Sequence, residues 1–391
     1  MDFHFTREDD AFRKELQDFL TAEWPGGTGD ASVDSDEEYL LERSFEEKLA
    51  SRGWLTMAWP VAYGGRGASH IRQAIMKEEC SYFRAPVGGG PGGQATGLVG
   101  PAIMAYGTEA QKERFLPPIA AGEVTWCQGF SEPEAGSDLA SVQTRAQHAG
   151  DNYILNGHKV WTSGAAYAGW IHVLARTNPD APKHKGLSYF LIDMRSPGIS
   201  YRPIPEMTGR AGFYETFFDN VAVPRENLLG EEDRGWYVAT TTLGLERSGM
   251  LRVGAVRRSF DDLVDHLRTL GGARRDIAGT AGLKLAERRI EIEVGRWLAY
   301  RVASMQDAGA TPNYEASVSK MFNTEVAQRL AGTSVNMLGL AGALALDAPG
   351  APMNGLAAFS YLLTVHWTIS AGSNEIQRNI IAQRGLGLPR D

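Results

Sequence analysis

Apolar residues recur at helical spacing along the first third of the chain. Thr6 can cap a first helix, and Pro25 can end it. A second helical stretch, over residues 110–115, is predicted to stop at Pro117-Pro118. The pattern predicts an N-terminal helical domain over residues 1–121. Four apolar residues share one face of the first helix: Phe12, Leu16, Phe19 and Leu20.

β-Prone runs replace the helical pattern at about residue 122. Asn156-Gly157 lies between two such runs, and this dipeptide predicts a tight hairpin turn. Pro224 closes the last predicted strand. We expect a small antiparallel β-domain over residues 122–230. Three further strands are predicted, at residues 171–175, 187–192 and 215–223.

Helical spacing returns from residue 231 to the end of the chain. Apolar residues there recur on one helix face, with Glu and Arg on the other: Leu283, Ala286, Ile290, Val294 and Trp297. The order of helices, strands and helices predicts an α+β chain whose C-terminal helical domain covers residues 231–391.

Composition narrows the class of protein. A chain of 391 residues suits two or three packed domains. The net charge of -8, without a basic stripe to offset it, argues against a nucleic-acid partner. Two cysteines, Cys80 and Cys127, cannot build a disulfide framework, which fits a reducing compartment. With no secretory signal and no apolar run of membrane-spanning length, we expect a cytoplasmic protein without a membrane span.

Several kinds of site find no support in the sequence. The eight histidines are far apart and lack metal-ligand spacing, so no metal site is expected. The chain has no Gly-x-Ser-x-Gly elbow for hydrolase chemistry. The glycine-rich run 88–93 lacks the preceding strand and the Lys-Ser or Lys-Thr of a phosphate loop, so we expect a flexible surface loop or pocket lining.

The segment Trp126–Asp138 is the most informative candidate for binding. Ser131, Gly136 and Ser137 can supply N–H groups and hydroxyls to an anionic or carbonyl-rich ligand. Taken alone, the segment could equally be a turn-rich connector.

Together with motifs before and after it, this segment resembles the acyl-CoA dehydrogenase family. One such motif is weak evidence, whereas the same order of motifs over nearly the whole chain is strong. In chain order they are Tyr106-Gly-Thr-Glu-Ala-Gln-Lys-Glu-Arg-Phe-Leu-Pro-Pro118, Ser131-Glu-Pro-Glu-Ala-Gly-Ser-Asp138, Lys159-Val-Trp-Thr-Ser163, Phe218-Asp-Asn-Val-Ala-Val-Pro224, Glu375-Ile-Gln-Arg-Asn-Ile-Ile381 and Leu386-Gly-Leu-Pro-Arg390.

The resemblance implies a C-terminal four-helix bundle and an FAD that lies between this bundle and the β-domain. It implies that Phe130 and Ser131 contact the flavin from their loop, together with Gly136. It also implies that Trp161 packs on the flavin ring and that Ser163 donates a hydrogen bond near flavin N5. The remaining implied contacts are Ser137 with the pantetheine arm, and Ser373 and Glu375 with FAD.

The sequence departs from the family at the catalytic base. Many members carry a glutamate where this chain has Ala371, whose backbone N–H could still bind the thioester oxygen. The family's alternative base position is a Glu-Arg pair, here Glu246-Arg247. Such a pair on a helix is usually a solvated charge pair. With Ala371 at the usual position, we expect Glu246 to be the base and Arg247 to engage the ligand.

The residues expected to bind FAD also depart from the family pattern. Arg268 is displaced by one place from the usual arginine, and Leu270 replaces an aromatic residue that holds the FAD of a neighbouring subunit. Asn336 and Gly339 match the family's glycine-rich FAD contact loosely. The overall pattern is similar to actinobacterial members of sterol side-chain breakdown, some of which are heteromers.

We therefore expect FAD-dependent α,β-dehydrogenation of a bulky or branched acyl-CoA, with an acceptor similar to electron-transfer flavoprotein. The expected assembly is a homotetramer or a heterotetramer with a paralogue. Two alternatives stay open: a half-site subunit that binds FAD poorly alone, and a flavin oxidase or monooxygenase on the same fold.

Overall fold

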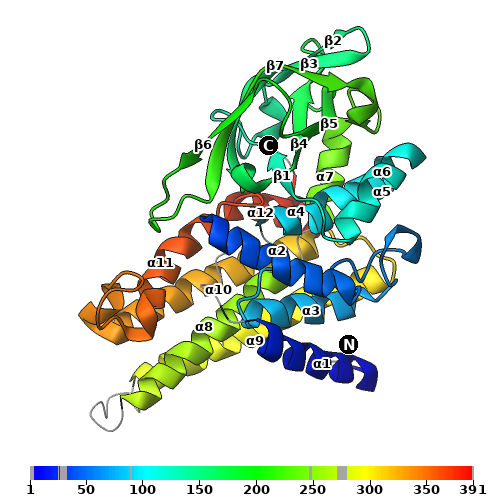
Figure 1. Ribbon diagram of the computed structural model, residues 1–391. Helices are drawn as coiled ribbons and strands as arrows, with labels where there is room; N and C mark the ends of the chain where they lie inside the picture. The colour runs from blue at the N-terminus through cyan, green and yellow to red at the C-terminus, as the bar shows by residue number, and fades with distance from the viewer. Residues whose placement is uncertain are drawn as a thin grey trace. The chain divides into compact units, whose positions relative to one another are not determined.

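The computed structural model divides into two compact units, each made from discontinuous segments (Figure 1). It describes residues 4–24, 26, 33–88, 90–245, 249–270 and 280–389. The helical unit comprises Met1–Gly29, Ser69–Ala85 and Arg247–Asp391. The sheet unit comprises Asp30–Ala68 and Pro86–Glu246. The three domain boundaries expected from the sequence stay a prediction.

The helical unit is built on the predicted bundle of α8, α9, α10 and α11. Thr6 caps α1 as predicted, because its side chain accepts a hydrogen bond from the Asp9 N–H. Leu263, Ile292 and Leu330 meet in the bundle core. The helices of the unit are α1 (Arg7–Glu23), α3 (His70–Tyr82), α8 (Met250–Thr269), α9 (Thr280–Asp307), α10 (Tyr314–Leu338), α11 (Leu356–Trp367) and α12 (Asn374–Ile380), with shorter turns at Gly339–Ala343, Pro352–Gly355 and Ile381–Gly385.

Helix α9 forms as predicted, but most of the predicted apolar face is exposed, whereas Ile292 on another side of the helix packs into the core. Leu283 is 73% exposed and Ile290 is 65% exposed. The covered side carries Ile292 together with one buried charge: Arg288 pairs with Glu291, which also pairs with Arg329 of α10. An apolar helix face left in water usually marks a surface that another chain covers.

The sheet unit contains an eight-stranded, mostly antiparallel sheet in the order β6-β7-β3-β2-β4-β5-β8, with β1 added beside β4. The three strands expected after residue 170 form as β4, β5 and β7. The strands are β1 (Trp126–Gly129), β2 (Arg145–Ala149), β3 (Asn152–Ser163), β4 (Trp170–Arg176), β5 (Leu187–Asp193), β6 (Ile199–Ile204), β7 (Phe213–Pro224) and β8 (Leu228–Leu229).

Helices of the same unit bury apolar residues against the sheet. Leu116 and Ile119 of α6 join Trp126 and Leu191 in one fully buried cluster. The helices are α2 (Asp36–Ser51), α4 (Gly90–Gln94), α5 (Gly100–Tyr106), α6 (Glu109–Ala120) and α7 (Gly235–Leu245), with shorter turns at Val61–Tyr63, Ala95–Val99, Leu139–Ser141, Ala165–Tyr167 and Arg225–Asn227.

The predicted hairpin turn at Asn156-Gly157 is wrong. Both residues lie inside β3, where the register against β7 shifts between Leu155 and Gly157. A Cβ at Gly157 would lie 2.3 Å from Thr144 Oγ1, so the glycine serves a bulge in a crowded strand. The chain reverses instead near Gly150, between β2 and β3.

The glycine run 88–93 is not the expected loop, because its described part from Gly90 onward is helical and buried. A Cβ at Gly92 would lie 1.8 Å from a carboxylate oxygen of Glu46, and a Cβ at Gly93 would lie 2.4 Å from the backbone of Gly88. The small residues therefore permit close packing and leave no open volume.

Helix α6 continues past Pro117-Pro118, where the sequence predicts a stop. Proline removes the partners of the Glu113 and Arg114 carbonyls, but both residues are exposed, so water can satisfy them. Burial of Ile119 holds the final turn.

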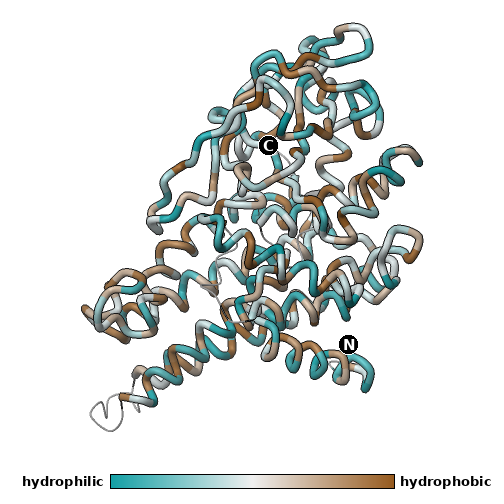
Figure 2. The backbone as a smooth tube through the Cα atoms, in the orientation of Figure 1, coloured by the Kyte–Doolittle hydropathy of each residue, from teal (hydrophilic) through white to brown (hydrophobic). Residues whose placement is uncertain are grey.

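Polar and apolar residues are interleaved along the helices (Figure 2). Among the described residues, no helix is long and apolar enough to cross a membrane.

Candidate functional site

The loop after β1 places a free hydroxyl and a free N–H at the edge of the sheet. The Phe130 ring packs inward, edge-on to His172 and Tyr189, so only its backbone faces the loop. Ser131 is partly exposed. Within the described ranges, neither its N–H nor its Oγ takes part in a hydrogen bond. Both groups of Ser131 can therefore serve a ligand.

Trp161 stands beside this loop on a bulge of β3. The Val160 N–H donates to the Ser131 carbonyl at 2.9 Å, which ties the strand to the loop. Trp161 then adopts a φ of +61°, within a register shift against β7, and is 58% exposed. A positive φ is costly for a bulky residue and often marks a functional site. Ser163 follows on the same strand, and its Oγ has no hydrogen bond in the described part of the chain.

Gly136 and Ser137 lie farther along the same loop and are exposed. The neighbouring Asp138 carboxylate accepts hydrogen bonds from Lys183 at 2.8 Å and from Ser141 at 2.6 Å. The bond from Lys183 is the main reason that the pKa of Asp138 lies below its ordinary value. No hydrogen bond in the described part of the chain uses the Ser137 N–H or hydroxyl, so both groups can serve a ligand.

In the helical unit, the turn between α11 and α12 holds Ala371 in a strained conformation. Ala371 has a φ of +55°, and Gly372 follows with +83°. The Asn374 N–H closes the turn on the Thr368 carbonyl at 2.8 Å, and the Gln377 side-chain amide donates to the carbonyls of Ala371 and Gly372, each at 3.1 Å. No hydrogen bond among the described residues uses the Ala371 N–H. This free donor is the group that the sequence predicts to bind a thioester oxygen.

A buried lysine that sequence reasoning missed supports this turn. Lys320 of α10 is 1% exposed, and its Nζ donates to the Gly372 carbonyl and to Asn374 Oδ1, each at 2.9 Å. A buried charge usually needs hydrogen-bond partners at fixed positions. Because two of the partners of Lys320 belong to this turn, Lys320 helps to hold the turn in place.

The other residues predicted to bind FAD lie at helix ends of the helical unit. Arg268 is exposed and pairs with Asp265 within α8. Asn336 and Gly339 are exposed at the C-terminal end of α10. The Ser373 hydroxyl accepts the Ile376 N–H and caps α12. Glu375 follows in the first turn, where a backbone N–H is the main cause of its lowered pKa.

The structure brings the predicted residues together in two groups, one in each unit. Phe130, Ser131, Trp161 and Ser163 form the group on the sheet unit, and Ala371, Ser373 and Glu375 form the group on the helical unit. Glu246 and Arg247 lie outside the described residues.

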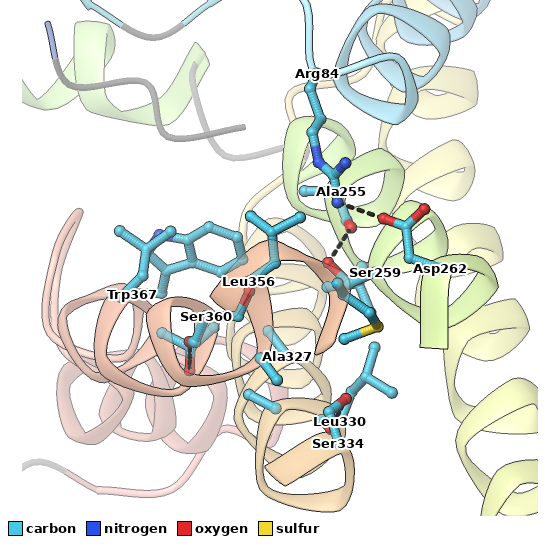
Figure 3. A pocket seen from close by; sticks show the side chains of 16 residues that line it. Arg84, Ala255, Ser259, Asp262, Ala327, Leu330, Ser334, Leu356, Ser360 and Trp367 are labelled. Carbon is cyan, nitrogen blue, oxygen red and sulfur yellow. Dashed lines mark hydrogen bonds and ion pairs between the residues drawn. The ribbon is translucent and has the colours of Figure 1, made fainter. Parts of the chain in front are cut away.

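A cavity inside the helical unit lies between α8, α10 and α11 (Figure 3). Its volume is about 50 Å³, whereas ligand pockets usually measure about 300–1,000 Å³. The Arg84–Asp262 ion pair lies at one end of it. This cavity is too small for a flavin or an acyl chain.

Known proteins match the chain along nearly its whole length. The family's N-terminal, middle and C-terminal domain profiles match residues 6–123, 127–221 and 233–386. The chain is 34% identical to "Acyl-CoA dehydrogenase FadE26" of Mycobacterium tuberculosis over 100% of this chain and 99% of that protein. The chain belongs to the acyl-CoA dehydrogenase family. The resemblance found in the sequence is thereby confirmed, as is the predicted fold class.

Two solved structures are similar to this chain over its full length. The "Tcur3481-Tcur3483 steroid ACAD" has a TM-score of 0.91 at 30% identity, with 100% of both chains covered. The "ChsE4-ChsE5 complex from Mycobacterium tuberculosis" has a TM-score of 0.89 at 33% identity, also with 100% of both chains covered. Members of the family are FAD-dependent oxidoreductases that act on the CH–CH bond of acyl-CoA, so the expected enzyme class is confirmed. Among the described residues, no group of His, Cys, Asp and Glu could hold a metal ion.

Proposed function

We propose that this acyl-CoA dehydrogenase binds FAD and introduces an α,β double bond into a bulky acyl-CoA thioester. The observation that carries the proposal is the surface formed by Ser131 and Trp161. An exposed indole, held on a strained bulge beside unused hydrogen-bond donors, suits a flat heterocycle with carbonyl oxygens. Family membership supplies the reaction type, and the cytoplasm is the compartment that the two unpaired cysteines suit.

The described residues fit FAD on the flavin side. The Trp161 indole would cover one face of the ring, and the hydroxyls of Ser131 and Ser163 would donate to its edge. The sequence resemblance also implies that Ser373 and Glu375, at the start of α12, contact FAD. Bound FAD would supply the acceptor for the hydride that leaves the β-carbon.

The chain's own residues would divide the remaining work. The Glu246 carboxylate would take the α-proton, and Arg247 would engage the ligand. The Ala371 N–H would donate to the thioester oxygen, where negative charge develops as the proton leaves. As the α-proton and β-hydride depart, the double bond forms between the two carbons. The proposed final acceptor of the two electrons is a protein similar to electron-transfer flavoprotein.

A bulky acyl group is the proposed substrate. One solved relative is described as a "steroid ACAD", and the sequence resemblance implies that Glu246 matches the base position of members that act on bulky chains. The glycine run 88–93, expected as a surface loop or pocket lining, gives this choice no support, because its described part is closely packed. We expect turnover of a steroid side-chain thioester to exceed that of butyryl-CoA, measured with an artificial electron acceptor. A clear preference for butyryl-CoA would contradict the proposed substrate class.

A half-site role is the second candidate. The ChsE4-ChsE5 structure is a complex of two named proteins, and Arg268 here pairs with Asp265 on its own helix. A chain that purifies colourless and turns yellow with a paralogue would favour the half-site role. Oxygen consumption without an electron carrier would instead favour an oxidase or monooxygenase.

The exposed face of α9 predicts an oligomer, either a homotetramer or a heterotetramer with a paralogue. Leu283→Lys would place a charge within this apolar face and should shift the assembly toward smaller species in light scattering. Val61→Lys is the matched control, because Val61 is equally exposed, at 73%, but lies in the sheet unit. If Leu283→Lys left the mass of the assembly unchanged, α9 would not be part of the subunit interface.

A further inference from the structure

The loop and the bulge of the sheet unit share one buried support. Lys159 of β3 is 0% exposed, and its ammonium donates three hydrogen bonds. The acceptors are the Phe130 carbonyl at 3.0 Å, Glu132 Oε1 at 2.8 Å and the Leu174 carbonyl at 2.8 Å. All three N–H groups are therefore used, each on a different part of the unit.

Glu132 extends this support to a further strand. Its Oε1 also accepts the Thr144 N–H at 2.9 Å, and its Oε2 accepts the Gln143 N–H at 2.6 Å. Burial alone would raise the pKa of Glu132, but Lys159 and these donors lower it. Burial lowers the pKa of Lys159 to about 8, against the attraction of Glu132. The pair is thus a charged cluster that joins the loop to the segment entering β2.

The position of the Lys159–Glu132 pair indicates its role better than its contribution to stability does. Replacing a buried ion pair by apolar residues is often neutral or stabilising, so stability alone does not explain it. Lys159 pulls the Phe130 carbonyl inward, immediately before the free N–H of Ser131. One residue along β3, the Val160 N–H holds the Ser131 carbonyl, and the next residue is the exposed Trp161.

We propose that the buried Lys159–Glu132 pair is a positioning device for the flavin, which fixes the Ser131 donors and the Trp161 indole on one side of the ring. The proposal rests on the proposed FAD-binding function. Neither residue touches the cofactor: they act through the backbone of the loop and through the bulge.

The test compares FAD binding and flavin potential with stability. Lys159→Met should weaken FAD binding by the apoprotein roughly tenfold or more, the loss expected for charge-assisted hydrogen bonds. It should also shift the reduction potential of the bound flavin and its visible circular dichroism. Gln111→Met is the matched control. Gln111 is buried and donates to the Glu226 and Leu228 carbonyls of the same unit, and its hydrogen bonds among the described residues do not involve the loop.

Because Lys159→Met leaves Glu132 buried without its cation, the double variant Lys159→Met with Glu132→Leu is measured beside it. The double variant should regain stability in urea yet still bind FAD weakly and with a shifted potential. Wild-type affinity and potential in either folded variant would overturn the positioning role while leaving the proposed function intact. A wild-type protein that binds no FAD, alone or with a paralogue, would overturn both.

Discussion

Replacing Glu246 with glutamine is expected to slow dehydrogenation by about 10²–10⁴-fold, the usual loss when a general base is removed. The reaction needs a carboxylate near the α-carbon, and Ala371 cannot supply one. Glutamine keeps the size and polarity of the side chain but cannot accept the proton. FAD content and thioester binding should therefore stay close to those of the wild type, and single-turnover flavin reduction would measure the loss.

Two further variants make this prediction specific. Ala371→Glu in the Glu246→Gln background should recover part of the rate, if both positions reach the same α-carbon. Ala371→Gly is the matched control, because glycine suits the φ of +55° and keeps the N–H. Near-normal turnover in Glu246→Gln would remove this residue from the mechanism and point to a base from a partner chain.

Glu78→Gln is expected to destabilise the helical unit by about 3–5 kcal/mol, the usual cost of breaking a buried ion pair from one side. Glu78 of α3 is 0% exposed. Its carboxylate accepts hydrogen bonds from Arg296 at 2.6 Å, from Arg13 at 3.0 Å and from the Tyr300 hydroxyl at 2.5 Å. Arg257 completes the cluster. An amide would remove the fully buried anion that these partly buried guanidinium groups share and would leave Arg13 paired with the Glu79 carboxylate alone.

The same cluster predicts a dependence on pH. Burial by itself would raise the pKa of Glu78, but Arg257, Arg296 and Arg13 outweigh it and lower the pKa to about 2. A lowered pKa in the folded state means that the contribution is present above the unfolded value of about 4.3 and is lost as pH falls toward 2. The stability gap between wild type and Glu78→Gln should narrow over that range.

Urea unfolding at neutral and acid pH would measure this gap. Asp18→Asn is the matched control, because Asp18 pairs with Lys14 on exposed positions of α1, and such pairs contribute about 0.5 kcal/mol or less. Equal midpoints for wild type and Glu78→Gln at neutral pH would contradict the role given to the cluster.

Local patterns in the sequence predicted which helices and strands form better than they predicted what those elements pack against. Thr6 and the apolar face behind it predicted α1, because capping and helical spacing are local properties. Asn156-Gly157 misled because crowding by Thr144, a residue of another segment, decides that backbone. On α9, spacing identified an apolar face, but which face turns inward depends on packing against other helices, where Glu291 pairs with Arg288 of its own helix and with Arg329 of α10.

The sequence pointed to those residues of the candidate site that belong to a recognisable motif. Ser131 and Trp161 belong to separate motifs, and the structure joins them through the Val160 N–H. Lys159 and Lys320 were missed because a lysine in a sequence is ordinarily assumed to be solvated. Alternation along β3 offered one signal, since Lys159 falls on the buried side with Tyr153 and Leu155.

Anaerobic addition of a steroid side-chain acyl-CoA to the purified protein tests the central claim most directly. The account predicts a yellow protein, alone or with a paralogue, whose visible flavin absorption bleaches in proportion to the thioester added. The product should be the enoyl-CoA that lacks two hydrogens. A protein that stays colourless in both preparations, or a bound flavin that no acyl-CoA bleaches, would contradict it.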